Sequence, residues 1–326
     1  MKRREFISLL GGATAAWPLT ARAQQSSMPV IGFLHARSQA DTAYYTTSFI
    51  HALAENGFIE NQTIKIHWRF ADGHYDRLPK MAADLVDRSV SLIVAGSDPA
   101  ALAAKHASAS IPIVFGVGGD PIQLKLVQSL NEPQGNATGI SILTGSLEPK
   151  RLGLLRDLLG PDRAIAVLLN PNLVPAQNQF HDIEAATKTI GWRPQFFWVS
   201  SDAEIDAALE KIGAQHLSAL EVTPDPFFDT RREKLAAWAT QNKMPTMFQF
   251  REYVVAGGLM SYGIDIVDAY RQLGLYAARV LKGEKPANLP VLQPTKFQFV
   301  INMKTARVLG VTFPPGLLSI ADEVIE

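Results

Sequence analysis

The chain has 326 residues, with 31 basic and 31 acidic side chains and no cysteine. A formal net charge of zero argues against a general electrostatic attraction to nucleic acid or to an anionic membrane. The missing cysteines exclude disulfides, thiolate nucleophiles and cysteine-based metal sites within these residues.

The N-terminal segment, residues 1–23, has the features of an export signal. Its basic start contains Arg3 and Arg4, and the apolar stretch 6–17 that follows is too short to span a bilayer. Small residues precede a cleavage site after Ala23. The arginine pair resembles a twin-arginine signal, and the general secretory route is the alternative. We therefore expect an exported, periplasmic protein from which this segment is removed.

Short apolar runs then alternate with helix-like stretches. In the first half of the chain the apolar runs are residues 29–35, 63–70, 91–96 and 111–117. Between them, apolar residues recur at helical spacing, as Tyr45, Phe49 and Leu53 do within 41–57. This alternation predicts a parallel sheet with helices on both faces.

The same pattern begins again in the second half. Apolar runs recur in the same order about 130 residues later, at 164–170, 195–200, 217–222 and 244–248. Helix-like stretches again lie between them. The chain therefore holds two copies of one βαβαβαβ unit, and we predict an α/β fold of two lobes with a groove between them.

Four apolar runs end at an Asp-Pro or Asn-Pro step. The residues that begin these steps are Asp98, Asp120, Asn170 and Asp225. Asp or Asn can cap a helix and Pro fits its first turn, so each step predicts a helix start. The steps also lie at strand carboxyl ends, where ligands bind in open α/β sheets. We expect the four starts to converge on the groove.

Common enzyme motifs are absent, including nucleophile elbows, phosphate-binding loops and metalloprotease helices. The histidines show no metal-ligand spacing, and only His35, at the end of the first strand, is a candidate site residue. We predict no metal and no cofactor. A cluster of Asp98, Asp120 and Asp225 for acid–base chemistry or for a cation is the alternative.

Several segments together resemble one family. They are RLPKMAADLV, IPIVFGVGGDPI, GNATGIS, DPFFDTRRE, AGGLMSYG, LKGEKPANLPV and KFQFVINMKTARVLG. They resemble the substrate-binding proteins of ABC importers, in the tryptophan/tyrosine-type group. The resemblance implies the type I periplasmic-binding fold, with two Rossmann-like lobes, parallel sheets and a three-stranded hinge.

The resemblance also implies lobe boundaries. The first lobe would comprise 29–140 plus about 255–290, and the second 141–254 plus about 291–326. The crossings would lie near 139–142, 247–258 and 288–294. The strand within GLMSYG and the helix 265–282 would then belong to the first lobe.

Carried onto this sequence, the resemblance implies pocket residues in both lobes. They are His35, Ser97, Asp98, Gly119, Asp120, Ser141, Asn170, Asn172, Asp225, Phe227 and Tyr262. Ser97 suits a ligand carboxylate and Asp225 an ammonium. Phe227 and Tyr262 could stack on a ring, although ordinary lobe packing explains them equally well.

We therefore expect a monomeric periplasmic receptor that closes on a small zwitterion or carboxylate and delivers it to an ABC permease. An amino acid, aromatic ones included, is the leading candidate. A sensor of the same fold that feeds a signalling receptor is the main alternative, and a periplasmic enzyme that uses the Asp-lined groove is a further one. The sequence does not name the ligand.

Overall fold

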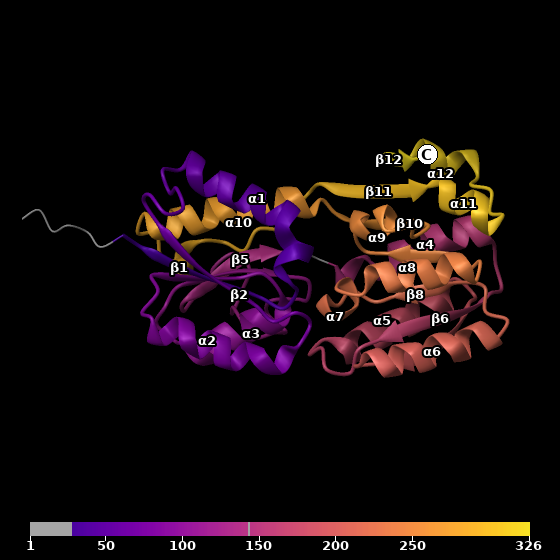
Figure 1. Cartoon of the computed structure of the whole chain (residues 1–326), viewed down its shortest axis with the longest axis horizontal. Helices are drawn as coiled ribbons and strands as arrows, with labels where there is room; N and C mark the ends of the chain where they lie inside the picture. Colours follow the sequence, from indigo (N-terminus) through magenta and orange to yellow (C-terminus); the bar gives the residue numbers. More distant parts are fainter. Residues whose placement is uncertain (1–27, 143) are drawn as a thin grey trace, which may run out of the picture.

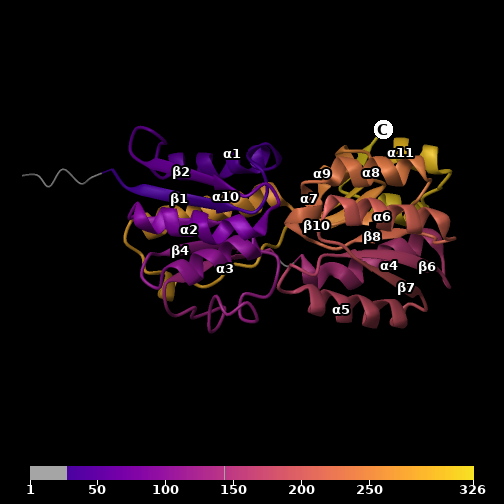
Figure 2. The ribbon, with the colours of Figure 1, turned by 60° about the horizontal axis from the view of Figure 1, so that its bottom comes forward.

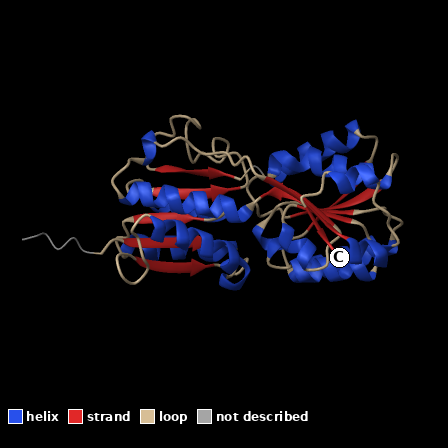
Figure 3. Cartoon of the chain, turned by 90° about the horizontal axis from the view of Figure 1, so that it is seen from above, coloured by secondary structure: helices blue, strands red, loops and turns tan. Residues whose placement is uncertain are grey.

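The structure is a computed structural model that describes residues 28–142 and 144–326. Two α/β lobes lie end to end along the long axis of the molecule (Figure 1). In the lobe that carries the C-terminus, the strands lie between two layers of helices (Figure 3), and the other lobe has the same arrangement in Figure 1. This is the predicted fold class. The expected export signal lies outside the described residues.

The first lobe has a five-stranded sheet in which every pairing is parallel. Its order is β2 (Lys65–Phe70), β1 (Val30–His35), β3 (Leu92–Ala95), β4 (Ile113–Val117) and β5 (Ala137–Ser141). Strands β3, β4 and β5 are buried along their whole length, which explains why they read as continuous apolar or small-residue runs.

Helices cover both faces of this sheet. On one face α1 (Gln39–Glu55) packs against α10 (Ile266–Leu281), and on the other α2 (Leu78–Asp87) packs against α3 (Asp98–Ala107). Figure 1 shows the two pairs on opposite sides of the strands, and in Figure 2 the pair α2 and α3 comes forward. Ser38 caps α1 by accepting a hydrogen bond from the Asp41 main-chain nitrogen, 3.1 Å away.

The second lobe has a seven-stranded sheet. Its order is β12 (Glu323–Ile325), β11 (Phe297–Asn302), β10 (Met260–Ile264), β9 (Thr246–Phe248), β8 (Leu220–Val222), β6 (Ala164–Leu169) and β7 (Arg193–Trp198). The sheet is mixed, because β11 runs antiparallel to β10 whereas the other pairs are parallel.

The helices of the second lobe follow the predicted pattern, with short additions. They are α4 (Glu148–Leu159), α5 (Ala176–Thr189), α6 (Asp202–Ala214), α7 (Pro226–Asp229), α8 (Arg232–Gln241), α9 (Arg251–Val255), α11 (Met303–Leu309) and α12 (Pro315–Ser319). No helix within the described residues has both the length and the apolar character that a membrane span requires.

The chain passes between the lobes three times, and the second passage differs from the prediction. The strand β10 was expected in the first lobe, but it pairs with β9 and β11 in the second. The chain crosses only after Ile264, where Asp265 caps α10. The prediction was wrong because β10, as one more apolar strand, has no sequence feature that says which sheet it joins.

A buried ion cluster holds the ends of the first two crossings. Glu148 and Arg151 of α4 and Glu221 of β8 are fully buried. Arg151 Nη2 donates to Glu148 Oε1 at 2.7 Å, and Arg151 Nε lies 3.8 Å from Glu221 Oε1. The same guanidinium donates to the main-chain carbonyls of Thr144 and Tyr262. One side chain therefore fixes Thr144, just after the first crossing, and the middle of β10, before the second, to helix α4 of the second lobe.

We expect Arg151→Leu to lower the free energy of unfolding by about 3–5 kcal/mol, because it leaves a buried carboxylate and two carbonyls without their donor. Arg156→Leu, at an exposed position of the same helix, is the matched control and should change stability by less than about 0.5 kcal/mol. Urea unfolding monitored by circular dichroism measures both. Equal effects would show that the buried cluster contributes nothing specific.

Candidate functional site

A pocket lies between the lobes, where the carboxyl ends of their parallel strands face each other. Its walls include His35, Ser97 and Tyr270 from the first lobe and Asp225 and Phe250 from the second. The space open to the centre of a water-sized sphere is ≈ 60 Å³. Because one water needs about 10–15 Å³ by this measure, the pocket in this closed form suits a small ligand.

His35 lines the pocket as predicted, but its ring is already hydrogen-bonded on both sides. Tyr270 donates its hydroxyl hydrogen to the Gly96 carbonyl at 2.9 Å, so its oxygen accepts from His35 Nε2 at 2.8 Å. His35 Nδ1 then accepts from the Arg37 main-chain nitrogen at 2.9 Å. Burial, and next the Arg37 guanidinium, hold the pKa of His35 well below its ordinary value. The ring is therefore a neutral support for the pocket wall.

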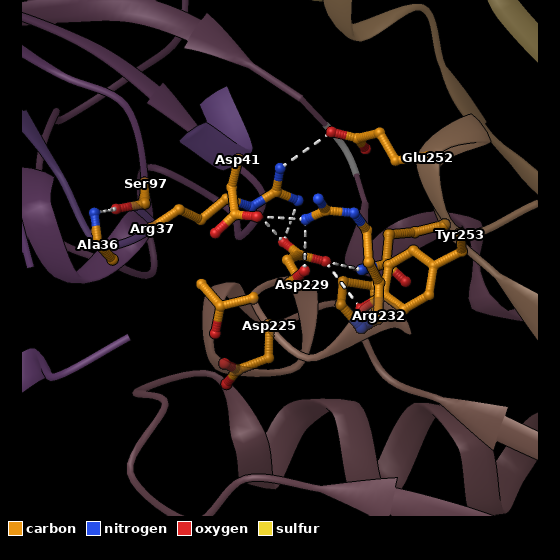
Figure 4. A network of polar contacts seen from close by, with 12 residues as sticks. Ala36, Arg37, Asp41, Ser97, Asp225, Asp229, Arg232, Glu252 and Tyr253 are labelled. Carbon is orange, nitrogen blue, oxygen red and sulfur yellow. Dashed lines mark hydrogen bonds and ion pairs between the residues drawn. The ribbon is translucent and has the colours of Figure 1, made fainter. Parts of the chain in front are cut away.

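Arg37 joins the two lobes across the groove (Figure 4). Its Nε donates to Asp229 Oδ2 at 2.8 Å, and its Nη1 donates to Glu252 Oε1 at 3.2 Å. Asp229 also accepts from Gln249 Nε2 at 2.6 Å and from the Tyr253 hydroxyl at 3.0 Å. Arg37 and Asp229 are almost fully buried. We call this set the interlobe latch.

A second ion pair crosses the groove beside the latch (Figure 4), between Arg232 of the second lobe and Asp41 of the first, at 2.5 Å. Both side chains are mostly buried. Burial favours the neutral form of Asp41, but hydrogen bonds from Ser38 and Arg232 outweigh it and lower the pKa of this carboxyl. The lobes therefore meet in a closed arrangement through several charged contacts.

Asp98 is buried in the pocket wall, and both of its oxygens are in use. They accept from the main-chain nitrogens of Gly118 at 2.7 Å and Gly119 at 3.0 Å. Burial nevertheless raises the pKa of Asp98 to about 6. Helix α3 begins here as predicted, with Ser97 at its N-cap. The carboxylate, however, holds the loop after β4 in place and is not a free ligand contact.

Asp225 differs, because one of its oxygens remains open. Oδ1 accepts from the Phe227 main-chain nitrogen at 2.6 Å and from the hydroxyl of Tyr75, which reaches across the groove. Oδ2 is buried and has no hydrogen-bond partner among the described residues. Burial raises the pKa of Asp225 to about 7, although hydrogen bonds from Tyr75 and from the Phe227 main chain, and the nearby Asn170 side chain, oppose this rise. Among the described residues, Asp225 is thus a pocket-lining side chain with an unsatisfied acceptor.

The other predicted site residues fall into two groups. Gly119, Asp120 and Ser141 line a second chamber that adjoins the pocket, together with Asp98. Four predicted residues are not among those that line the pocket or the second chamber: Asn170, Asn172, Phe227 and Tyr262.

Local structure explains these four positions. Asn170 Oδ1 accepts from the Asn172 main-chain nitrogen at 3.0 Å, which closes a turn. The Phe227 ring lies 3.9 Å from the Arg231 guanidinium. Tyr262 stays in the second lobe on β10, where it packs against Phe299. None of the four side chains lines the pocket, although that of Asn170 lies next to Asp225.

The prediction of four converging helix starts holds for two. Helices α3 and α7 begin at Asp98 and after Asp225. Asp120 accepts from the main-chain nitrogen of Ile122 at 2.7 Å and closes a turn without a regular helix. After Asn170 the helix α5 begins only at Ala176. The three aspartates also form no metal-binding group within the described residues.

The sequence analysis missed the residues that join the lobes. Arg37 lies two positions after the first strand and Asp229 lies within DPFFDTRRE, and neither position has a sequence feature that indicates a partner in the other lobe. Tyr45 and Tyr270, from the two packed helices α1 and α10, also line the pocket. The helical spacing of Tyr45 predicted its burial correctly, but nothing in that spacing indicated which end of the helix would line the pocket.

Comparison with known proteins gives one consistent family. The family model described as ABC transporter substrate binding protein matches residues 37–325. The tyrosine-binding protein of Clostridioides difficile strain R20291 is 28% identical over 261 residues, covering 80% of this chain and 75% of that protein.

Solved structures agree. A Streptococcus pneumonia ABC domain in complex with L-Trp is 27% identical, with a TM-score of 0.83, and covers 92% of this chain and 100% of that one. A conserved domain protein from Vibrio cholerae reaches a TM-score of 0.85 at 24% identity, covering 91% of this chain and 99% of that one. At this identity the second likeness shows the fold alone.

We expect Arg37→Met to open the ligand-free protein, because the closed form would bury Asp229 and Glu252 without their cation. Breaking a buried pair costs about 3–5 kcal/mol, and each 1.4 kcal/mol changes a population ratio about tenfold. Small-angle scattering should show a larger radius of gyration. Arg279→Met, which removes an exposed pair with Glu284 inside the first lobe, is the control. Identical profiles for both variants would refute the latch.

Proposed function

The chain belongs to the ABC transporter substrate-binding proteins, and we propose that it binds an amino acid between its lobes and delivers it to an ABC permease. The observation that carries this proposal is the open Oδ2 of Asp225, a buried acceptor in the interlobe pocket. A ligand ammonium would supply the missing donor and charge. We propose binding without catalysis and a monomer, since one chain supplies both walls.

A ligand carboxylate has a complementary candidate on the other lobe. Ser97 Oγ accepts from the Ala36 main-chain nitrogen at 3.3 Å, so the hydroxyl hydrogen points elsewhere and can donate. The start of α3 adds the positive end of a helix dipole. The two charges of an amino acid would then be recognised by opposite lobes, which makes closure depend on a ligand that carries both.

Aromatic and aliphatic side chains complete the pocket. Tyr45, Tyr270 and Ile266 line it from the first lobe, and Phe250 lines it from the second. Such walls favour a ligand with an apolar or aromatic body. The names of the two relatives, one tyrosine-binding and one solved with L-Trp, support an aromatic amino acid. We propose L-tyrosine and L-tryptophan as the first ligands to test.

We expect Asp225→Asn to weaken binding of L-tryptophan about tenfold or more, because a hydrogen bond to a charged group is worth about 1.5–3 kcal/mol. Asn keeps the Oδ1 acceptor of the cap but places an NH₂ donor toward the ammonium. Calorimetry with L-tryptophan, its amide and tryptamine measures both contacts. Asp157→Asn, at an exposed position of α4 that lines neither the pocket nor the second chamber, should bind like wild type. Unchanged affinity in Asp225→Asn would disprove the ammonium contact.

Calorimetry of ligand binding can also detect protons that Asp225 releases. With a pKa of about 7 in the empty pocket, the Asp225 carboxyl is roughly half protonated at pH 7. A ligand ammonium binds the ionised form of the Asp225 carboxyl, so binding should release a proton from that fraction of the protein in which Asp225 is protonated. The affinity should therefore rise with pH through about 7 and then level off. Titrations in buffers of different ionisation enthalpy detect the release. The release should be absent in Asp225→Asn.

We further propose export to the periplasm by the twin-arginine route, on the basis of Arg3 and Arg4, with cleavage after Ala23. Changing both arginines to lysine should block export by that route and leave secretory export intact. Fractionation and N-terminal sequencing measure the outcome, with Gln24 as the expected first residue. A mature protein that keeps Met1 would contradict the signal assignment.

A further inference from the structure

The second chamber adjoins the ligand pocket. Asp98, Gly118, Thr144 and Pro224 line both spaces. The second chamber has ≈ 250 Å³ open to the centre of a water-sized sphere, against ≈ 60 Å³ for the pocket. A ligand that extended from the pocket past Thr144 and Pro224 would therefore enter a larger space.

Gln179 of α5 brings a buried acceptor to this chamber. Its side chain is 5% exposed, and its Nε2 donates to the Pro224 carbonyl at 2.9 Å. Only the amide nitrogen can donate to a carbonyl, so this bond determines which end of the amide is which. Oε1 therefore remains an acceptor, and it has no partner among the described residues.

The charges around the chamber have one sign. Asp120 and Asp182 line it together with Asp98, and its described lining residues include no lysine, arginine or histidine. A ligand carboxylate or phosphate would meet acceptors and negative charge there. A hydroxyl, an indole or amide N–H, or a cationic group would instead supply the donor that Gln179 Oε1 lacks.

The two acceptors without a partner among the described residues, Asp225 Oδ2 and Gln179 Oε1, both lie close to Pro224. Gln179 is bonded to the carbonyl of Pro224, and Asp225 follows Pro224 directly. Building on the proposed function, we propose that the second chamber is a subsite in which Gln179 accepts a hydrogen bond from a donor at the far end of the ligand. The protein then selects amino acids whose side chains end in an O–H or N–H donor over apolar ones of the same shape.

Matched ligand pairs test this subsite on the purified mature protein. The pairs are L-tyrosine with L-phenylalanine, L-tryptophan with 1-methyl-L-tryptophan, and tyramine with phenethylamine. In every pair that binds, we expect calorimetry to show at least about tenfold tighter binding of the first compound. The second compound of the pair lacks the distal donor and leaves Gln179 Oε1 unpaired. Similar affinities within the binding pairs would overturn the subsite, whatever the variants do.

Gln179→Met keeps the length of the side chain but removes the Oε1 acceptor and also the Nε2 donor to Pro224. Loss of the donor should affect both members of a pair, whereas loss of the acceptor weakens only the donor-bearing ligand, so the preference should fall to within about twofold. Asn178→Ala is the control, since Asn178 also lines the chamber but donates to Gln123 across the groove at 2.7 Å. It should change both members of a pair equally. A preference that survives in folded Gln179→Met overturns the assignment of Gln179.

Tyramine and phenethylamine have an ammonium group but no carboxylate, so their binding tests the Gln179 subsite independently of the proposal that the ligand is an amino acid. If only tyramine and phenethylamine bind, the ligand is not an amino acid, and their ratio still tests Gln179. If the amino acids bind without regard to the distal donor, the proposed function stands and the subsite fails. Binding of none of the six compounds would overturn both.

Discussion

The closed groove depends on a buried cation that belongs to one lobe and is neutralised by the other. Arg37 follows the first strand of the first lobe, and its carboxylate partners Asp229 and Glu252 lie on helices of the second. Separated lobes would return these groups to water, whereas closed lobes must pair them. Such a contact contributes to the closed state only, so it sets how much free energy a ligand must add to complete closure.

The proposed ligand contact is coupled to the same closure through Asp225. Its Oδ1 accepts from Tyr75 of the opposite lobe, whereas its Oδ2 is left open. Burial raises the pKa of this carboxyl to about 7, so closing the empty pocket disfavours its charge. A bound ammonium would restore that charge and remove the penalty. Closure and recognition would therefore share one carboxyl group, and a neutral ligand could not substitute.

Short polar residues at the strand ends serve both the fold and the pocket. Asp98 begins α3 yet holds the Gly118–Gly119 loop, and Asp225 caps α7 yet faces the ligand space. Gln179 likewise secures the Pro224 carbonyl while its oxygen remains open. Both Asp98 oxygens accept from the main chain, whereas Asp225 and Gln179 each use one atom for the main chain and keep one oxygen without a partner among the described residues. A capping role for Asp225 therefore does not exclude the proposed ligand contact.

The sequence by itself determined the duplicated α/β pattern, the parallel strands and the position of His35, Ser97 and Asp98 at strand ends, because hydrophobic period and capping residues are local properties. The tertiary structure alone decided that β10 joins the second sheet, and that Arg37 meets Asp229, 192 positions away. It also decided which oxygens stay open. Pairing across a groove depends on how two separately folded sheets approach each other, and no local pattern encodes that distance.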